Sequence, residues 1–554
     1  MTRIPVLIVV LLAANVSAVE IRIDALAGRK AISPYLYGRN NSLSDDPRKP
    51  LSKADWGFLQ EAGVRMLRES GGNNSTKYNW QLKLSSHPDW YNNVYAHDWD
   101  YSVKSLQENL PWVQGMWAFQ LIGKAAASKA YNFNDWAYNR SQWWEGVSNN
   151  WAGGGGPLVG GGQKKGNPAL YLMDWSAHDT VGILDHWFDP NGLGLDPNGC
   201  LYWNMDNEPE IWSGTHDDVY PKQPSVEAFM QAYFAVAKKA RDRFPHIKLA
   251  GPIACNEWQW YNWANDRIKG ADGRYYCWLE YFIKRIGEEQ RACGLLLLDV
   301  LDVHFYPGEA SSADIVHLHR VWFDTTYNYP GANGVKRLGT WGWDNSITKE
   351  YIFTRCRHWL DTYLGRNHGV VLGVSEMGIQ GDNPNVTAVW YASTLGVFAD
   401  EGVELFTPWT WKTGMWEVLH LFSRYCREIR VQSSSDHEET VSAYASISAD
   451  VNAMTIILVN RSLDQTSETR VTIADFTLTE PAYTTLTLSQ LPGKETFHSH
   501  ADNALKKGAV LVNEGRMDLA LPPLSVTAVL LRDDQNDIPH SGTSRIEEPV
   551  TNGE

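Results

Sequence analysis

The chain has 554 residues, 64 of them acidic and 49 basic, and its formal net charge is −15. Nucleic-acid binding depends on clustered Lys and Arg, so this excess of acidic residues argues against a nucleic acid as the partner. A neutral polymer is a better fit. The length exceeds what one ordinary core holds, so we expect one large domain and one smaller domain.

The N-terminus has the pattern of an export signal. Arg3 is followed by an apolar run over residues 4–14 and by small residues at 16–18, which predicts a cleaved signal peptide over residues 1–18 and a secreted protein. The alternative is a membrane anchor, but the run is shorter than the ~20 residues that span a bilayer. No later stretch is long and apolar enough, so we expect no membrane contact.

Short apolar runs separated by helical patterns predict a (β/α)8 TIM barrel over residues 32–428. The clearest helical stripe lies at residues 225–243, and further helices are expected at 349–364 and 385–400. The expected barrel strands are residues 35–39, 64–68, 116–121, 201–205, 247–250, 300–305, 370–374 and 404–408.

The pattern changes after the barrel. Alternating apolar residues between turn-forming segments predict a C-terminal antiparallel β-sandwich over residues 429–532, which an N-terminal strand within 19–31 is expected to join. Residues 533–554 are polar and acidic, which predicts a disordered tail. A Gly-rich insertion at 153–162 predicts a flexible loop at the barrel mouth. The six Cys are irregularly spaced and signal neither a zinc site nor a disulfide scaffold, although one or two bridges could form after export.

Catalytic groups of such barrels lie at the C-terminal ends of strands. Here Glu208 follows the fourth predicted strand and Glu376 follows the seventh. These strands face each other across a barrel, so the two carboxyl groups can converge on one glycosidic bond, and hydrolysis with retention needs two carboxyl groups roughly 5 Å apart. The alternative for Glu208 is an acid on a surface loop. The sequence around Glu376 is weak as a motif, so the prediction for Glu376 depends on its place in the strand count.

Three segments together resemble glycoside hydrolase family 44: residues 32–38 (Ile-Ser-Pro-Tyr-Leu-Tyr-Gly), residues 68–73 with 78–80, and residues 206–212 (Asp-Asn-Glu-Pro-Glu-Ile-Trp). The resemblance covers about residues 19–531. It implies a retaining endoglucanase or xyloglucanase acting on β-1,4-glucans, with Glu208 as acid/base and Glu376 as nucleophile. A tyrosine expected soon after the nucleophile is absent, because Met377 and Gly378 stand there.

Further residues are expected to support the two glutamates. Asn207 could hydrogen-bond the sugar 2-hydroxyl, or it could be a turn residue. Arg68, at the end of the second strand, could hold Glu376 ionised. Tyr306 could donate to the nucleophile, and His304 could contact the nucleophile or a sugar hydroxyl.

Aromatic residues are abundant, with 26 Trp and 25 Tyr, and their flat faces suit stacking on sugar rings. Trp409 and Trp411, beside the eighth strand, are candidates for a substrate platform, with core packing as the alternative for whichever points away from the cleft. Three further tryptophans are weaker candidates. They are Trp80, Trp117 and Trp212.

No cofactor is required for this chemistry, but a structural calcium could be held by Asp98, Asp100 or Glu145 through oxygen ligands. A polysaccharide is the expected partner, and the chain is expected to be a monomer. Xylan, mannan or mixed-linkage glucan remain alternative substrates, because the fold does not fix the polymer. A non-catalytic carbohydrate-binding protein would explain the tryptophans but not the paired glutamates.

Overall fold

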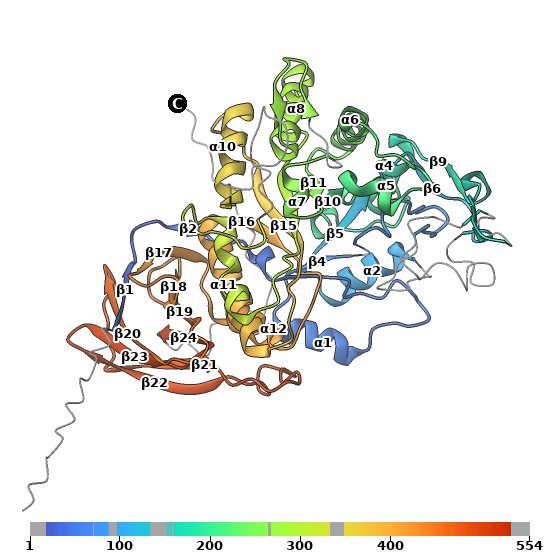
Figure 1. Cartoon of the computed structure of the whole chain (residues 1–554). Helices are drawn as coiled ribbons and strands as arrows, with labels where there is room; N and C mark the ends of the chain where they lie inside the picture. Colours follow the sequence, from blue (N-terminus) through green and yellow to red (C-terminus); the bar gives the residue numbers. More distant parts are fainter. Residues whose placement is uncertain are drawn as a thin grey trace, which may run out of the picture.

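The structure is a computed structural model that describes residues 18–69, 71–87, 97–132, 152–153, 156–157, 160–263, 268–332 and 348–532. The predicted signal peptide (apart from its last residue), Glu145, part of the Gly-rich insertion and the predicted tail lie outside these residues. Figure 1 shows a parallel barrel wrapped by helices and, beside it, an all-β domain built mainly from the C-terminal part of the chain.

Eight parallel strands form the barrel, and each of the eight predicted runs supplies one of them. In spatial order they are β3 (Gly38–Asn40), β4 (Met66–Arg68), β5 (Gln114–Phe119), β10 (Tyr202–Met205), β11 (Lys248–Ala254), β14 (Val300–Phe305), β15 (Val371–Met377) and β16 (Val403–Phe406). The first and last strands are joined by a hydrogen bond of 3.2 Å from Asn40 N to Pro408 O, so the barrel is nearly closed.

Close packing explains local features of the barrel. A Cβ atom added to Gly38 would lie 2.5 Å from the Phe406 carbonyl oxygen, so only glycine lets β3 approach β16 this closely. The first predicted strand begins later than expected, because Pro34 starts a short 3-10 helix, Pro34–Leu36, capped by Ser33. Large apolar side chains fill the interior, as in other barrels of this type: Met66, Met116, Tyr202, Ala250, Ile253, Val300 and Leu405.

Helices surround the barrel, and their ends follow the usual capping rules. The Ser52 side chain caps the N-terminus of α1 in a capping box with Asp55, and Ser225 caps α6, which satisfies backbone N–H groups that lack helical partners. The long helices are α1 (Lys53–Ala62), α2 (Trp99–Asn109), α4 (Ala177–Phe188), α6 (Val226–Arg243), α8 (Trp278–Cys293), α10 (Ile352–Leu364), α11 (Pro384–Glu401) and α12 (Met415–Tyr425).

Short segments decorate the C-terminal ends of the strands, where a site is expected. The helices α5 (Trp212–Thr215), α7 (Glu257–Trp260) and α9 (Ser312–Ile315) follow β10, β11 and β14. Small two-stranded sheets pair β6 (Lys124–Ala126) with β9 (Leu172–Asp174), β7 (Gly156–Pro157) with β8 (Gln163–Lys164), and β12 (Ile268–Lys269) with β13 (Tyr275–Tyr276).

The second domain is the predicted all-β domain, and its sheet closes on itself through the N-terminal strand that was expected to join it. β1 (Val19–Asp24) pairs antiparallel with β17 and parallel with β20, and so joins the two ends of the sheet. The other strands are β2 (Lys30–Ala31), β17 (Ile429–Ser435), β18 (Val441–Ile447), β19 (Met454–Asn460), β20 (Ser467–Ala474), β21 (Ala482–Leu488), β22 (Lys506–Asn513), β23 (Arg516–Leu521) and β24 (Ser525–Leu531).

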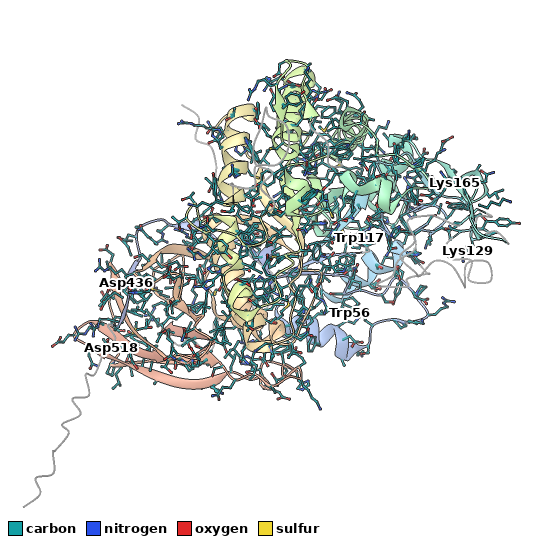
Figure 2. All side chains as sticks on the ribbon, viewed as in Figure 1. Trp56, Trp117, Lys129, Lys165, Asp436 and Asp518 are labelled. Atoms are coloured by element: carbon teal, nitrogen blue, oxygen red, sulfur yellow. The ribbon has the colours of Figure 1, made fainter. Side chains whose placement is uncertain are left out.

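Helix α11 connects the two domains, since it packs on the strands β18, β19 and β24 as well as on the barrel. In Figure 2 the labelled Trp56 and Trp117 lie on the barrel side, and Asp436 and Asp518 lie in the all-β domain. All six Cys are free thiols, so neither of the bridges that the sequence allowed is formed. No helix among the described residues combines the length and the apolarity needed to cross a bilayer.

Candidate active site

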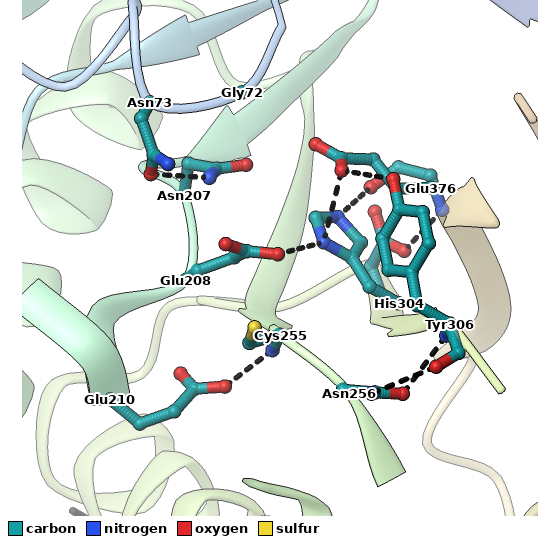
Figure 3. A network of polar contacts seen from close by, with 12 residues as sticks. Gly72, Asn73, Asn207, Glu208, Glu210, Cys255, Asn256, His304, Tyr306 and Glu376 are labelled. Atoms are coloured by element: carbon teal, nitrogen blue, oxygen red, sulfur yellow. Dashed lines mark hydrogen bonds and ion pairs between the residues drawn. The ribbon is translucent and has the colours of Figure 1, made fainter. Parts of the chain in front are cut away.

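Glu208 and Glu376 lie at the C-terminal ends of β10 and β15 and point toward each other across the barrel mouth (Figure 3). Both are largely buried, with 7% and 5% of their surface exposed. One carboxylate oxygen of each and one ring nitrogen of His304 all lie within 4.8 Å of one another. Two carboxyl groups therefore meet at one point, which the strand count alone could only suggest.

Glu376 is held by charged and neutral donors. Arg68 Nη1 donates to its Oε1 at 2.6 Å, and the Tyr306 hydroxyl donates to its Oε2 at 2.7 Å. These are the contacts that the strand-end positions of Arg68 and Tyr306 predict. Burial alone would raise the pKa of Glu376, but the neighbouring His304 and Arg68 and the Tyr306 hydrogen bond outweigh it and lower this pKa. The carboxyl group is thereby kept ionised.

Arg68 organises the floor of the site. Its side chain is 1% exposed and it donates to four acceptors. These are Asn204 Oδ1 at 2.9 Å, Asn40 Oδ1 at 3.2 Å, Glu376 Oε1 at 2.6 Å and Asn207 Oδ1 at 2.8 Å. The planar guanidinium group can satisfy several acceptors at fixed angles. One residue of β4 thus fixes side chains from β3, β10 and β15.

The backbone around Glu208 adopts left-handed conformations, with φ of 68° at Asp206 and 43° at Glu208. Such conformations are costly for residues other than glycine and persist where the surroundings enforce them. Here the buried Asp206 carboxyl accepts from Leu121 N at 2.6 Å and from Asn207 N at 2.8 Å. Glu208 N donates to Ile253 O at 3.1 Å. These bonds turn the Glu208 side chain into the site.

His304 lies between the two glutamates and is fully buried. Its Nδ1 atom is 2.9 Å from Glu208 Oε1 and 3.6 Å from Glu376 Oε2. The sequence placed His304 near the nucleophile, whereas the closer contact is to Glu208. Burial, and after it the charge of the neighbouring Glu208, raises the pKa of the Cys255 thiol, which lies on another side of Glu208.

Asn207 carries an amide that is shared between two neighbours. Its Oδ1 accepts from Arg68, and its Nδ2 donates to Asn73 Oδ1 at 3.1 Å. Since Nδ2 carries two hydrogens, one further donor remains for a ligand. This arrangement favours a substrate-facing amide over a simple turn residue.

The tryptophans separate into two groups. Trp409 follows β16 and its ring lies against Gly72. A Cβ atom added to Gly72 would lie 2.8 Å from this ring. Trp411 instead packs under the site, with ring centroids 4.4 Å from Trp416 and the Arg39 guanidinium 5.1 Å from its ring. Trp409 therefore fits a platform, and Trp411 fits core packing.

The weaker platform candidates are corrected by their burial and contacts. Trp117 and Trp212 are each 1% exposed, so no sugar ring can reach their faces. Trp212 Nε1 donates to Asn207 O at 3.0 Å, which gives it a supporting position. Trp80 donates from Nε1 to Asp179 O at 2.7 Å and stacks on His186 with centroids 5.1 Å apart, away from the two glutamates.

Several site residues escaped the sequence reasoning. Glu210 is 1% exposed and accepts a hydrogen bond from Cys255 N, and burial raises its pKa well above the ordinary value, which favours the neutral acid. The Asn256 side chain holds the backbone of Tyr306, because its Oδ1 accepts from Tyr306 N at 2.9 Å and its Nδ2 donates to Tyr306 O at 3.1 Å. Glu210 stands in the motif already quoted, so its spacing from Glu208 was an available signal.

The calcium candidates contact protein groups. Asp98 caps α2 and pairs with Lys83 at 2.7 Å. Asp100 accepts from Trp187 Nε1 at 2.8 Å and lies 2.9 Å from His186 Nε2. Glu145 lies outside the described residues, and the structural calcium stays a prediction.

Comparisons with known proteins agree with this geometry. The model of glycoside hydrolase family 44 matches residues 85–309. A β-mannanase/endoglucanase A of Caldicellulosiruptor saccharolyticus is 24% identical over 84% of this chain, and this chain covers 36% of its length. Endoglucanase A of Paenibacillus lautus is 23% identical over 95% of this chain and 74% of its own length. The chain thus spans about a third of the first relative and about three quarters of the second.

Solved structures share the fold. CelM2, a bifunctional glucanase-xylanase protein from a metagenome library, has a TM-score of 0.73 at 21% identity and covers 93% of this chain and 99% of its own. The family 44 endoglucanase of Clostridium thermocellum has a TM-score of 0.71 at 20% identity over 93% of this chain and 100% of its own. The match to the family model over residues 85–309, which include Glu208, and the shared two-domain fold make this chain similar to glycoside hydrolase family 44.

Proposed function

We propose that this glycosidase hydrolyses β-1,4-glucans, including xyloglucan, internally and with retention, with Glu208 as acid/base and Glu376 as nucleophile. The separation of the two carboxylates carries the proposal. Retaining enzymes place these groups about 5–5.5 Å apart and inverting enzymes about 6.5–9.5 Å apart. An oxygen of Glu208 and an oxygen of Glu376 lie within 4.8 Å of each other, which supports retention.

The unlike surroundings of the glutamates support the assignment of roles. Arg68 and Tyr306 hydrogen-bond Glu376 and its pKa is lowered, as a nucleophile requires. Glu208 contacts His304 and lies beside the Cys255 thiol. A pair of carboxyl groups whose environments differ in this way separates the nucleophile from the acid.

In the first step, the Glu208 proton passes to the glycosidic oxygen while a Glu376 oxygen bonds to the anomeric carbon and the C–O bond breaks. In the second step, ionised Glu208 takes a proton from water, whose oxygen displaces Glu376 from the anomeric carbon. The free Asn207 amide hydrogen binds the sugar 2-hydroxyl, and the Trp409 face supports a sugar ring. Both contacts strengthen as the ring distorts toward the transition state.

The substrate class rests on relatives. The relatives and structural neighbours include endoglucanases, a xyloglucanase, a glucanase-xylanase and a mannanase/endoglucanase. A β-1,4-linked backbone is common to these polymers, so glucan comes first and xylan or mannan second. The pattern of residues 1–18 supports export, and a polysaccharide outside the cell suits a monomeric secreted enzyme.

The roles are tested with Glu208→Gln and Glu376→Gln on soluble glucan and xyloglucan. Each change should lower reducing-sugar release at least ~1,000-fold, since each removes a bond-making group. Glu227→Gln on the outer helix α6 is the matched control and should keep activity. Wild-type-like turnover by either site variant would refute the assignment, and a preference for mannan with no action on xyloglucan would move the substrate.

A further inference from the structure

The regular pairing between β10 and β11 ends before the chain reaches Glu208. Tyr202 pairs with Lys248, and the last pair of this ladder is Asn204 with Ala250. The ladder therefore does not itself hold Glu208 against the end of β11. Other hydrogen bonds must fix the turn that carries the acid/base.

One backbone hydrogen bond continues the pairing past the end of the ladder, since Glu208 N donates to Ile253 O at 3.1 Å. In a parallel pair, a residue that donates to one carbonyl of the neighbouring strand accepts from the N–H two residues further along that strand. The expected second bond would run from Cys255 N to Glu208 O. Glu208 instead adopts φ 43° and ψ 57°, and its carbonyl accepts from Ile211 N at 3.2 Å.

Glu210 supplies the acceptor that the Glu208 carbonyl does not. Its Oε1 atom accepts from Cys255 N (Figure 3). The residue is 1% exposed, and its Oε2 atom has no hydrogen-bond partner among the described residues. Burying a polar group is unfavourable unless it is hydrogen-bonded, so the bond to Cys255 N is what justifies an acid at this buried position.

Both sides of this contact have a strained backbone. The φ angle is 43° at Glu208 and 63° at Ile253, and such left-handed conformations are costly, most of all for a β-branched residue. The register of β11 with β14 also shifts between Pro252 and Ala254, as in a bulge that re-aims the backbone. The two strained segments are held together by the bonds that Glu208 N and the Glu210 carboxyl group make to β11.

We propose that Glu210 is a positioning residue, whose carboxyl group replaces the Glu208 carbonyl as the acceptor for Cys255 N–H and so holds Glu208 in the turn that aims it at the glycosidic oxygen. The proposal rests on the acid/base role of Glu208. Without the Glu210 acceptor, Cys255 N–H pairs with Glu208 O as in a regular parallel ladder. The backbone of Glu208 then becomes extended, and its side chain leaves its position opposite Glu376.

The kinetic test compares two aryl β-cellobiosides. A phenyl leaving group needs acid assistance and a 2,4-dinitrophenyl group does not, so Glu210→Leu should lower kcat/KM about 10- to 100-fold for the first and less than about 3-fold for the second. Glu210→Gln keeps a carbonyl oxygen that can accept from Cys255 N and should restore both values. Equal losses on the two substrates in Glu210→Leu would mean a purely structural role and would overturn the proposal.

Two further variants guard against a general loss of structure. Glu210→Asp keeps the carboxyl group but shortens the side chain by one methylene, so it should show a smaller loss that is again confined to the phenyl substrate. Glu417→Leu is the matched control, because Glu417 of α12 is a buried glutamate that accepts from Ala504 N at 3.0 Å in the all-β domain. It should lower the melting temperature and leave the ratio of the two kcat/KM values unchanged. A full loss on both substrates in Glu210→Asp would also overturn the proposal.

A second measurement does not depend on activity. Crystal structures should show Glu208 in the left-handed conformation in the wild type and in Glu210→Gln, and extended in Glu210→Leu with its carbonyl accepting from Cys255 N. An unchanged left-handed Glu208 in Glu210→Leu would overturn the proposal. If the backbone changes as expected but Glu208→Gln keeps full activity, the acid/base assignment fails and the role of Glu210 in holding the turn stands.

Discussion

Arg68→Lys is the most informative single change around the nucleophile. Lysine keeps the positive charge, but its ammonium group cannot reach the four acceptors that Arg68 contacts from one planar group. The side chain is 1% exposed, so each unmet acceptor stays buried. A hydrogen bond to a charged group contributes about 1.5–3 kcal/mol, and more than one such bond is lost here. If about 3 kcal/mol of this is lost in the transition state, kcat/KM falls roughly 100-fold.

The pH profile gives the sign of the effect. The hydrogen bond from Arg68 is one of the contacts that lower the pKa of Glu376, so Arg68→Lys, which loses this bond, raises this pKa and the acidic limb of kcat/KM moves to higher pH. The same interaction stabilises the fold above the unfolded pKa of about 4.3, and this contribution disappears as the pH falls through the lowered folded pKa.

The assay is reducing-sugar release from soluble glucan across pH, with the melting temperature recorded in parallel. The matched control is Arg461→Lys. Arg461 is a buried arginine that follows β19 in the all-β domain and contacts Ser393 of α11 and Tyr444 of β18. This change should lower stability and leave the acidic limb in place. An unmoved acidic limb in Arg68→Lys would refute the view that this arginine keeps the nucleophile ionised.

Three further changes test the rest of the site. Tyr306→Phe removes the 2.7 Å hydrogen bond to Glu376. Because a hydrogen bond to a charged group contributes about 1.5–3 kcal/mol, kcat/KM should fall about 10- to 100-fold. The acidic limb of the kcat/KM profile should also move to higher pH. Glu210→Gln should keep kcat within about 3-fold, because burial already keeps Glu210 neutral, and a large loss would mean that its charge takes part. Trp409→Ala should raise KM several-fold through lost stacking. Trp411→Ala should instead lower the melting temperature, since truncating a packed Trp costs about 3–5 kcal/mol, and the reverse pattern would exchange their roles.

The barrel could be read from the sequence because its strands are nearly continuous apolar runs, as expected for parallel strands covered on both faces. The two glutamates follow from the same reasoning, since the ends of β10 and β15 meet at one mouth. The all-β domain and the N-terminal strand that joins it were also predicted, but the closure of its sheet could not be read in this way. The pairing of β1 with both β17 and β20 joins segments more than 400 residues apart, and periodicity carries no record of such a partner.

The contact of Ser375 with His304 was missed because of a local irregularity of the strands. A period of two places Ser375 on the face opposite Glu376, and only the bulge between β14 and β15 brings both to His304. The tryptophans failed for another reason, because composition does not tell a buried ring such as Trp117 from an exposed platform.

Trapping of the covalent intermediate tests the central claim most directly. A 2-deoxy-2-fluoro-β-cellobioside with a dinitrophenyl leaving group slows the second step of a retaining enzyme, so the sugar should remain bound to the protein. Peptide mapping by mass spectrometry should then find one added 2-fluorocellobiosyl group on Glu376 in the wild type and none in Glu376→Gln. Rapid turnover with no labelled peptide, or a label on another carboxyl group, would contradict the assignment of Glu376 as the nucleophile.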